Sequence, residues 1–301
     1  RKPRSAEQFT FGACRMKQMN LRSLLLGVLL TLSTLPVLAQ TKPVKDPKTR
    51  LAKAEAMFQE RCKKSGEFIH RTVEDVEGIF LLKIRPKEIN YGDQYRMDDP
   101  YGRDWGGDGY SLSFVRGSFQ ANTTGTPAAG SPSRLGYLYV DALDPKDGTR
   151  YRYTGGIKVV GKKDVSAEGV KRNLEKNPNY DLNIYSFVLD KTPAPSPAPR
   201  YGVTYDDIST REERDYWIAG SWLKVIDLKT NEVVAERIGY MMDRGQGNTS
   251  GGRAPWLLAA DNACPSFFRN PNLPPNGHGS RAQSRQAQDF VEKTLKPRLE
   301  K

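Results

Sequence analysis

Residues 216–242 contain the longest run of strand-forming side chains in the chain, YWIAGSWLKVIDLKTNEVVAERIGYMM. Trp, Ile, Val, Tyr and Leu on both sides of a polar turn predict a β-hairpin, and Asn231 tolerates the left-handed conformation that closes the turn. With residues 229–231 as the loop, Leu228 faces Glu232 and Lys224 faces Glu236, which places opposite charges across the strands. Both faces of the hairpin are apolar, so we expect it inside a sheet that other elements cover.

The N-terminal part of the sequence predicts export. Lys17 and Arg22 form a basic region, residues 24–35 form an apolar core, and Val-Leu-Ala at positions 37–39 forms a cleavage site before Gln40. The alternative is an uncleaved anchor, but the apolar run is short for a bilayer and no charged stop-transfer flank follows it. We therefore expect a periplasmic or secreted protein with no stable membrane span after cleavage.

This pattern divides the chain into two parts. Residues 1–39 are predicted to be upstream sequence plus a cleaved signal peptide, with the signal beginning at Met16 or Met19. Residues 40–301 are predicted to be a single β-rich domain in which the Pro-rich stretch at 191–200 is a surface crossover. Of the formal net charge of +12, the first 39 residues carry +5 and the domain carries +7. The basic residues alternate with acidic ones, so we expect no nucleic-acid partner.

Short strand-like runs separated by turn residues fill the domain, and helices are expected at both of its ends. Asp46 and Pro47 predict the start of the first helix, and Ser280 the start of the last. The runs within 68–86 predict an early strand pair, and residues 110–119 predict a further strand. The chain is therefore expected to be α+β and β-rich, with about eight to ten strands in a largely antiparallel sheet or sandwich. Local signals include Gly148 in a DPKDG turn and a capping box from Thr210 to Glu213.

Two cysteines follow the predicted cleavage site, Cys62 and Cys264. An exported chain with an even number of cysteines favours a disulfide, and Cys62 falls on the apolar stripe of the first predicted helix. The alternative is two separate buried thiols.

Most catalytic patterns are absent from the sequence. It has no Gly-x-Ser-x-Gly elbow and no HExxH pair, and its two histidines, His70 and His278, do not make a zinc set with the cysteines. We expect no metal and no cofactor. A pair of carboxylates among Asp99, Asp104 and Asp108 remains an alternative, because a glycosidase needs only two suitably spaced acids.

Two loops, residues 95–110 and 243–256, are dense in aromatic, acidic, Arg and Gly residues. Loops on rigid strands carry recognition, and Trp and Arg side chains suit a contact surface. If the loops share one rim of the sheet, we expect that rim to bind another envelope protein or an anionic or glycan ligand. The candidate binding residues are Arg103, Asp104, Trp105, Asp108, Arg244, Arg253 and Trp256.

The function that we expect from the sequence is therefore an exported, non-catalytic binding protein of the bacterial cell envelope. Two alternatives stay open. One is a carboxylate-dependent cell-wall hydrolase, and the other is a structural accessory subunit of an envelope or secretion complex. A concave pocket holding two of the carboxylates favours the first, and an exposed apolar patch without a pocket favours the second.

Overall fold

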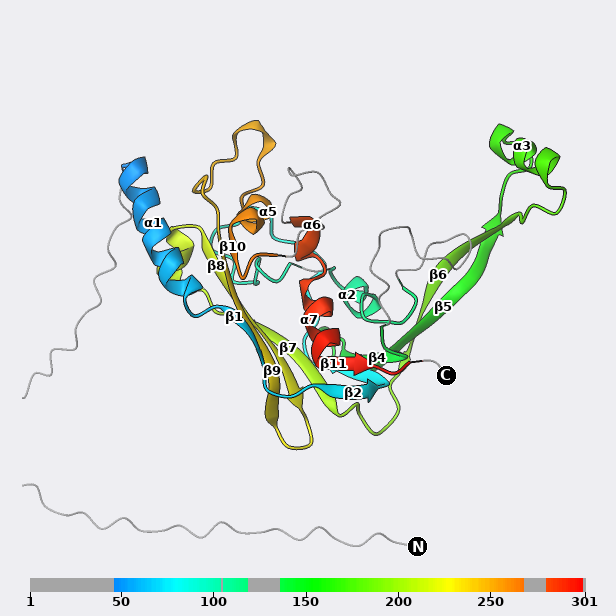
Figure 1. Ribbon diagram of the computed structural model, residues 1–301, viewed down its shortest axis with the longest axis horizontal. Helices are drawn as coiled ribbons and strands as arrows, with labels where there is room; N and C mark the ends of the chain where they lie inside the picture. The colour runs from blue at the N-terminus through cyan, green and yellow to red at the C-terminus, as the bar shows by residue number, and fades with distance from the viewer. Residues whose placement is uncertain (1–45, 104, 119–135, 268–279, 300–301) are drawn as a thin grey trace, which may run out of the picture. The chain divides into compact units, whose positions relative to one another are not determined.

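A nine-stranded, mostly antiparallel sheet organises the chain (Figure 1). The computed structural model describes residues 46–103, 105–118, 136–267 and 280–299, so the predicted signal peptide, Asp104 and His278 lie outside the described residues. The prediction of a β-rich α+β fold is confirmed. Along the sheet the strands are β1 (Gly66–Ile69), β9 (Glu232–Met242), β8 (Ile218–Asp227), β7 (Tyr201–Asp207), β3 (Gly78–Leu81), β4 (Tyr139–Leu143), β5 (Arg150–Lys162) and β6 (Asn183–Pro193), and β10 (Ala263–Cys264) also pairs with β9.

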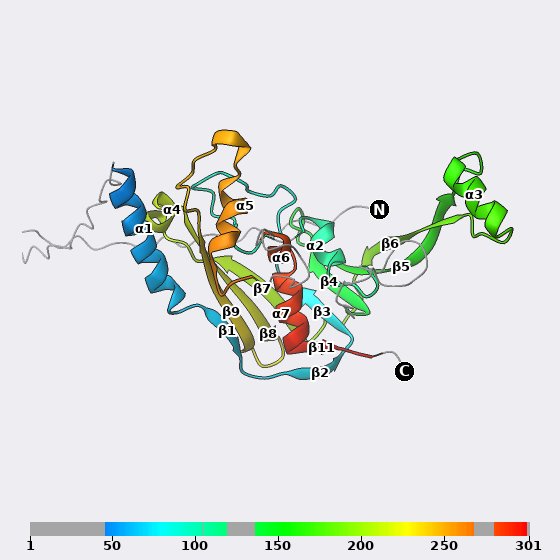
Figure 2. The ribbon, with the colours of Figure 1, turned by 45° about the horizontal axis from the view of Figure 1, so that its top comes forward.

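Helices cover both faces of the sheet (Figure 2). Helix α1 (Pro47–Cys62) packs Ala54 and Phe58 against Ile218 of β8. Helix α7 (Gln286–Thr294) packs Phe290 against Leu223, which is on the opposite face of β8 because side chains alternate along a strand. The remaining helical elements are α2 (Asp108–Leu112), α3 (Glu168–Lys176), α4 (Arg211–Asp215), η1 (Ser250–Gly252), α5 (Pro255–Ala259), η2 (Ala260–Asn262) and α6 (Ser280–Gln283), and β2 (Val73–Val76) pairs in parallel with β11 (Leu295–Pro297).

The predicted hairpin is the β8–β9 pair, and it lies inside the sheet between β7 and β1. Lys224 pairs with Glu236 as predicted, and Asn231 has a φ of 60°. The predicted pairing of Leu228 with Glu232 is wrong, because a register shift between Val225 and Ile226 brings Asp227 opposite Glu232. This register shift is a β-bulge in which Val234 is the extra residue. The side chain of Val234 lies on the face of the sheet that packs against α7.

Two predicted strand assignments are wrong. Residues 108–112 form helix α2 instead of the start of a strand, because Tyr110 and Phe114, four residues apart, both point into the core. The early strands do not pair with each other either. Strand β1 pairs with β9, whereas β3 lies in parallel between β4 and β7, where long-range contacts supply its partners.

The predicted disulfide is confirmed. Cys62 at the end of α1 and Cys264 in β10 are bonded, with their Cα atoms 5.5 Å apart. The bond joins the first described helix to a strand that lies 202 residues later in the sequence. None of the helices in the described ranges is both long enough and apolar enough to cross a bilayer.

Asp227, at the end of β8, joins three parts of the chain. Its side chain is fully buried and accepts hydrogen bonds from the guanidinium groups of Arg200 at 2.7 Å and Arg71 at 3.0 Å. The backbone N–H of Lys229 donates a third hydrogen bond at 3.1 Å. The hydrogen bonds from Arg200 and Arg71 outweigh the effect of burial and hold the pKa of Asp227 well below its usual range.

We expect replacement of Asp227 by Asn to lower the free energy of unfolding by about 1–2 kcal/mol at pH 7, because both arginine partners are half exposed. The folded-state pKa is depressed, so the stabilisation is complete above the ordinary carboxyl pKa of about 4 and is lost as the pH falls below it. Urea unfolding of the wild type and the variant at pH 7 and at pH 3 measures the loss of unfolding free energy at each pH. An equal loss at the two pH values contradicts this role for Asp227.

Candidate functional site

The loop at 243–256 contacts the segment just before the loop at 95–110, at one end of the β8–β9 hairpin. The backbone N–H of Trp256 donates to the Tyr91 carbonyl at 3.0 Å, and its indole N–H donates to the Asp93 carbonyl, also at 3.0 Å. Trp256 also packs against Trp217, with ring centroids 5.0 Å apart and the ring planes tilted by 45°, and Trp217 directly precedes β8. The loop that ends at Trp256 therefore lies against the segment that leads into the loop at 95–110.

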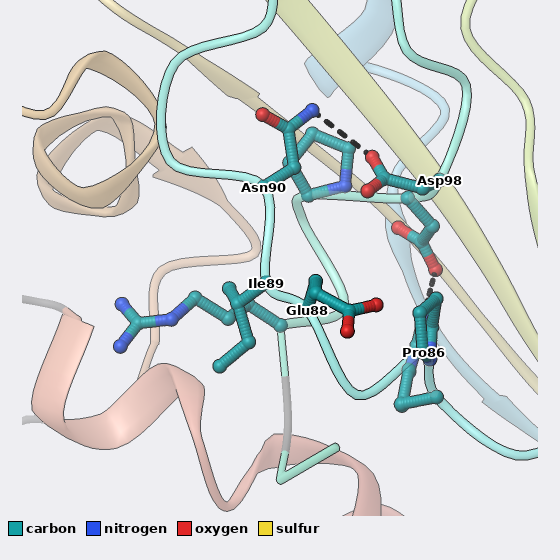
Figure 3. Close-up of a pocket in the computed structure, with 9 residues that line it drawn as sticks. Pro86, Glu88, Ile89, Asn90 and Asp98 are labelled. Carbon is teal, nitrogen blue, oxygen red and sulfur yellow. Dashed lines mark hydrogen bonds and ion pairs between the residues drawn. The ribbon is translucent and has the colours of Figure 1, made fainter. Parts of the chain in front are cut away.

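Asn90 gives this segment a fixed shape. Its side-chain oxygen accepts the backbone N–H groups of Gly92 and Asp93, and its amide donates to the Asp93 carbonyl and to the Asp98 carboxylate at 3.0 Å. Asn is well suited to such a turn because its short side chain replaces backbone hydrogen bonds locally. Figure 3 shows the Asn90 amide directed at Asp98.

Asp99 anchors the same segment to the sheet. It has a φ of 58°, and one carboxylate oxygen accepts hydrogen bonds from Arg85 at 2.6 Å and from the Ser221 hydroxyl of β8 at 2.7 Å. The other oxygen accepts the backbone N–H of Gly102 at 2.9 Å. Arg85 and Asp99 are both buried, and this buried ion pair holds the loop base against β8.

A small hollow lies between these residues (Figure 3). It encloses about 20 Å³, which is room for about one water-sized group and far below the pockets that hold a whole small molecule. Burial raises the pKa of Asp98, although Asn90 and Arg96 act in the opposite direction. The hollow therefore fits one small chemical group. Its lining residues are Arg85, Pro86, Glu88, Ile89, Asn90, Asp98, Asp99, Pro100 and Arg103.

Arg103 is the predicted site residue that lines this hollow. Its guanidinium carbon lies 4.9 Å from the centre of the Tyr91 ring. Its Nε and Nη1 atoms are shielded from solvent and have no hydrogen-bond partner within the described ranges. An oxygen acceptor that enters the hollow would find these two donors unpaired.

Large apolar and aromatic side chains are exposed in the same segment. Trp105 is 53% exposed, Met97 49%, Tyr91 44% and Tyr95 40%. The guanidinium carbon of Arg211 lies 3.5 Å from the centre of the Tyr95 ring. We call the described residues of 91–105 the aromatic loop. The predicted binding loop at 95–110 contains Tyr95 and Met97, but neither was among the candidate binding residues. Tyr91 lies outside that loop, although the run NYGDQYRM already combines aromatic and turn residues.

Two of the carboxylates considered for catalysis, Asp99 and Asp108, accept hydrogen bonds from different parts of the chain. Asp99 is occupied by Arg85, Ser221 and Gly102. Asp108 begins α2 and accepts the Tyr153 hydroxyl of β5 at 2.7 Å, and burial with this hydrogen bond raises the pKa of Tyr153 to about 12. Asp104 lies outside the described residues.

The second loop is held by its own ion pair. Buried Asp243 accepts the backbone N–H groups of Gly245 at 3.0 Å and Gly247 at 2.8 Å, and Arg253 at 2.7 Å. Arg253 therefore closes this loop. Arg244 instead forms a surface ion pair of 2.9 Å with Glu55 of α1.

Trp256 does not provide the contact surface expected from the sequence. It is fully buried. Pro255 starts α5 and directs the indole toward Trp217 and the end of the sheet, where it joins a separate apolar cluster. Of the two tryptophans predicted to bind, only Trp105 presents its side chain to solvent.

No protein family, curated protein or solved structure matches this chain. Within the described ranges, no group of three or more His, Cys, Asp or Glu side chains is arranged to hold a metal ion. The geometry of the aromatic loop and its hollow is therefore the basis for a functional proposal.

Proposed function

We propose that the protein is an exported, non-catalytic binding protein of the bacterial cell envelope, periplasmic or secreted, and that it binds another envelope protein through the aromatic loop. The observation that carries this proposal is the exposure of Tyr91, Tyr95, Met97 and Trp105 beside Arg103 on one anchored segment. Tyr, Trp, Met and Arg are the residue types enriched in protein interfaces. The signal-like N-terminus and the disulfide support export.

The chemistry of the hollow indicates what the partner presents. Arg103 brings donors without acceptors, while the nearby acids Asp98 and Asp99 have Arg96 and Arg85 as ion-pair partners. A carboxylate or carbonyl oxygen of the partner satisfies Arg103, and the aromatic side chains around it exclude water. The small size of the hollow suits one oxygen-bearing group at the tip of a partner side chain better than a whole glycan or small molecule.

The hydrolase alternative has less support. A glycosidase needs two carboxylates that flank the substrate, one of them free to accept a proton or attack. Asp99 has its oxygens occupied by three donors, and Asp108 bonds a tyrosine on β5. We therefore do not assign a catalytic role to either residue.

We expect Trp105→Ala and Arg103→Glu each to weaken partner binding about tenfold or more, because truncating a central aromatic or reversing a recognition charge is costly at an interface. The matched control is Thr230→Ala, since Thr230 is exposed in the β8–β9 turn, at the other end of the hairpin. The tagged mature chain is expressed in its host, and the amount of envelope protein that copurifies is measured for each variant. Copurification that is unchanged in both loop variants contradicts the proposed surface.

A further inference from the structure

One edge of the large sheet is long and unpaired in the described chain. Strand β6 is the last strand of the sheet, and within the described ranges its only strand partner is β5. It has 11 residues, whereas β1 at the other edge has four. Because β4 pairs only with residues 150–153 of β5, the rest of β5 and β6 extends as a two-stranded arm that ends near α3 (Figure 1). Residues 154–193 include no buried side chain.

The hydrogen bonds of β5 fix which groups of β6 face the open edge. The backbone N–H of Ala194 donates to the Arg150 carbonyl of β5 at 2.9 Å. In an antiparallel strand, alternate residues direct both backbone groups to the same neighbour, so the even-numbered residues of β6 bond to β5. The odd-numbered residues direct theirs outward. Pro193, which has no N–H, belongs to this outward set, as expected of a proline on an edge strand.

The outer half of this edge lacks the usual protection against pairing. Exposed edges are normally blocked by charges, proline or bulges. Residues 183–189, NIYSFVL, contain neither a charge nor a proline, and the register shift in this region is in β5 and leaves β6 continuous. Ile184 of β6 and Val159 of β5 are also exposed. An edge of this kind pairs readily with another extended strand.

We propose that a second copy of this chain pairs with β6, strand to strand and antiparallel, with the twofold axis at Val188. The outward backbone groups of four residues in each copy then form about eight hydrogen bonds across the axis. In this register the side chains of β6 from residue 185 to residue 191 meet complementary side chains from the second copy. Phe187 lies opposite Leu189, Ser186 opposite Asp190, and Tyr185 opposite Lys191.

Neighbouring registers are less favourable. Moving the axis to Phe187 places Asp190 opposite Ile184, and moving it to Leu189 places Asp190 opposite Val188. Both of these registers place the Asp190 carboxylate against an aliphatic side chain, whereas the axis at Val188 places it opposite the Ser186 hydroxyl. The same register joins the apolar faces of the two arms, because Phe187, Leu189 and Ile157 share one face of the β5–β6 pair. The complementarity is that of the strand with itself, which favours a second copy over an unrelated partner.

A cysteine at the axis tests the register. In the mature chain Cys62 and Cys264 are bonded to each other, so Val188→Cys introduces the one free thiol. At the axis, Val188 forms a pair without hydrogen bonds whose Cα atoms are about 4.5 Å apart, within the range for a disulfide. We expect mild oxidation to convert most of this variant into a covalent dimer. Ser186→Cys is the matched control, because its thiol faces Asp190 and should cross-link at least tenfold more slowly.

A charge at the axis tests the interface without cross-linking. In Val188→Lys two ammonium groups oppose each other directly, so the dimer dissociation constant measured by sedimentation equilibrium should rise at least tenfold. Val188→Thr keeps a β-branched, uncharged side chain, so its dimer dissociation constant should stay within about threefold of the wild-type value. A wild-type chain that is monomeric at about 100 µM, or a dimer that Val188→Lys leaves intact, overturns the proposal. Trp105→Ala should not change the dimer dissociation constant, because Trp105 is in the aromatic loop and not on β6. The dimer proposal can therefore fail while the proposed binding function stands, and the reverse also holds.

Discussion

Replacing both Cys62 and Cys264 by serine is expected to lower the free energy of unfolding by about 4–5 kcal/mol. The bond closes a loop between residues 202 positions apart, and in the chain-entropy model a loop of this length restricts the unfolded chain strongly. In a chain that begins at the predicted cleavage site, Gln40, and therefore lacks Cys14, the double variant leaves no unpaired thiol, so new disulfides do not complicate the comparison.

Urea unfolding of the oxidised wild type, the reduced wild type and the double-serine variant measures this effect. The reduced wild type and the variant should agree with each other and fall well below the oxidised chain. Helix α1 should be the first element to lose protection in hydrogen exchange, since the bond fixes its last residue to β10. A loss smaller than about 1 kcal/mol contradicts this role for the disulfide.

Replacing Trp256 by alanine is expected to cost about 3–5 kcal/mol of unfolding free energy. The fully buried indole packs against the ring of Trp217, and the guanidinium carbon of Arg214 lies 4.9 Å from the centre of the Trp256 ring. The variant leaves a cavity in this cluster and removes the hydrogen bond to the Asp93 carbonyl. The aromatic loop should therefore loosen as well as the core.

Two matched variants separate these contributions. Trp256→Phe keeps a ring in the cluster but lacks the indole donor, so it should cost less than Trp256→Ala, by at least 1 kcal/mol. Trp105→Ala removes an exposed tryptophan and should change stability by less than about 0.5 kcal/mol. Equal losses at positions 105 and 256 contradict the assignment of one tryptophan to the surface and the other to the core.

Local features of this fold were predictable because their causes lie within a few residues. Asp46 caps α1 by accepting the Thr49 N–H, and Thr210 with Glu213 forms the predicted capping box. Gly148 and Asn231 have the positive φ values expected of their turns. Each depends on side-chain chemistry and backbone preferences that act over one turn.

Features that depend on distant contacts were not predictable. The shift between Val225 and Ile226 changes the register after Lys224, and no charge pattern within the hairpin signals it. Strand β3 finds parallel partners in β4 and β7, which lie far along the chain. The run YSLSFV at 110–115 alternates polar and apolar residues as a strand does, but packing in the core selects a helix for its first residues.

The candidate site was predictable only in part for the same reason. The aromatic and basic composition of the loops was visible in the sequence, and Trp256 at the end of one loop contacts residues 91 and 93, just before the other. Composition does not show that Trp256 packs inward, that Arg253 closes its own loop on Asp243, or that Arg103 lines a hollow with Asn90. Burial and ion pairing decide which side chains are available to a partner, and both depend on the whole fold.

The most direct test of an exported binding protein with this surface is photocrosslinking in living host cells. A photoreactive amino acid replaces Trp105 in one strain and Thr230 in another, and mass spectrometry identifies the adducts. We expect an adduct with an envelope protein at position 105, little at position 230, and a mature chain that begins at Gln40. Adducts of equal yield at both positions, or a chain that retains residues 24–35 and crosslinks to cytoplasmic proteins, would contradict the proposed function.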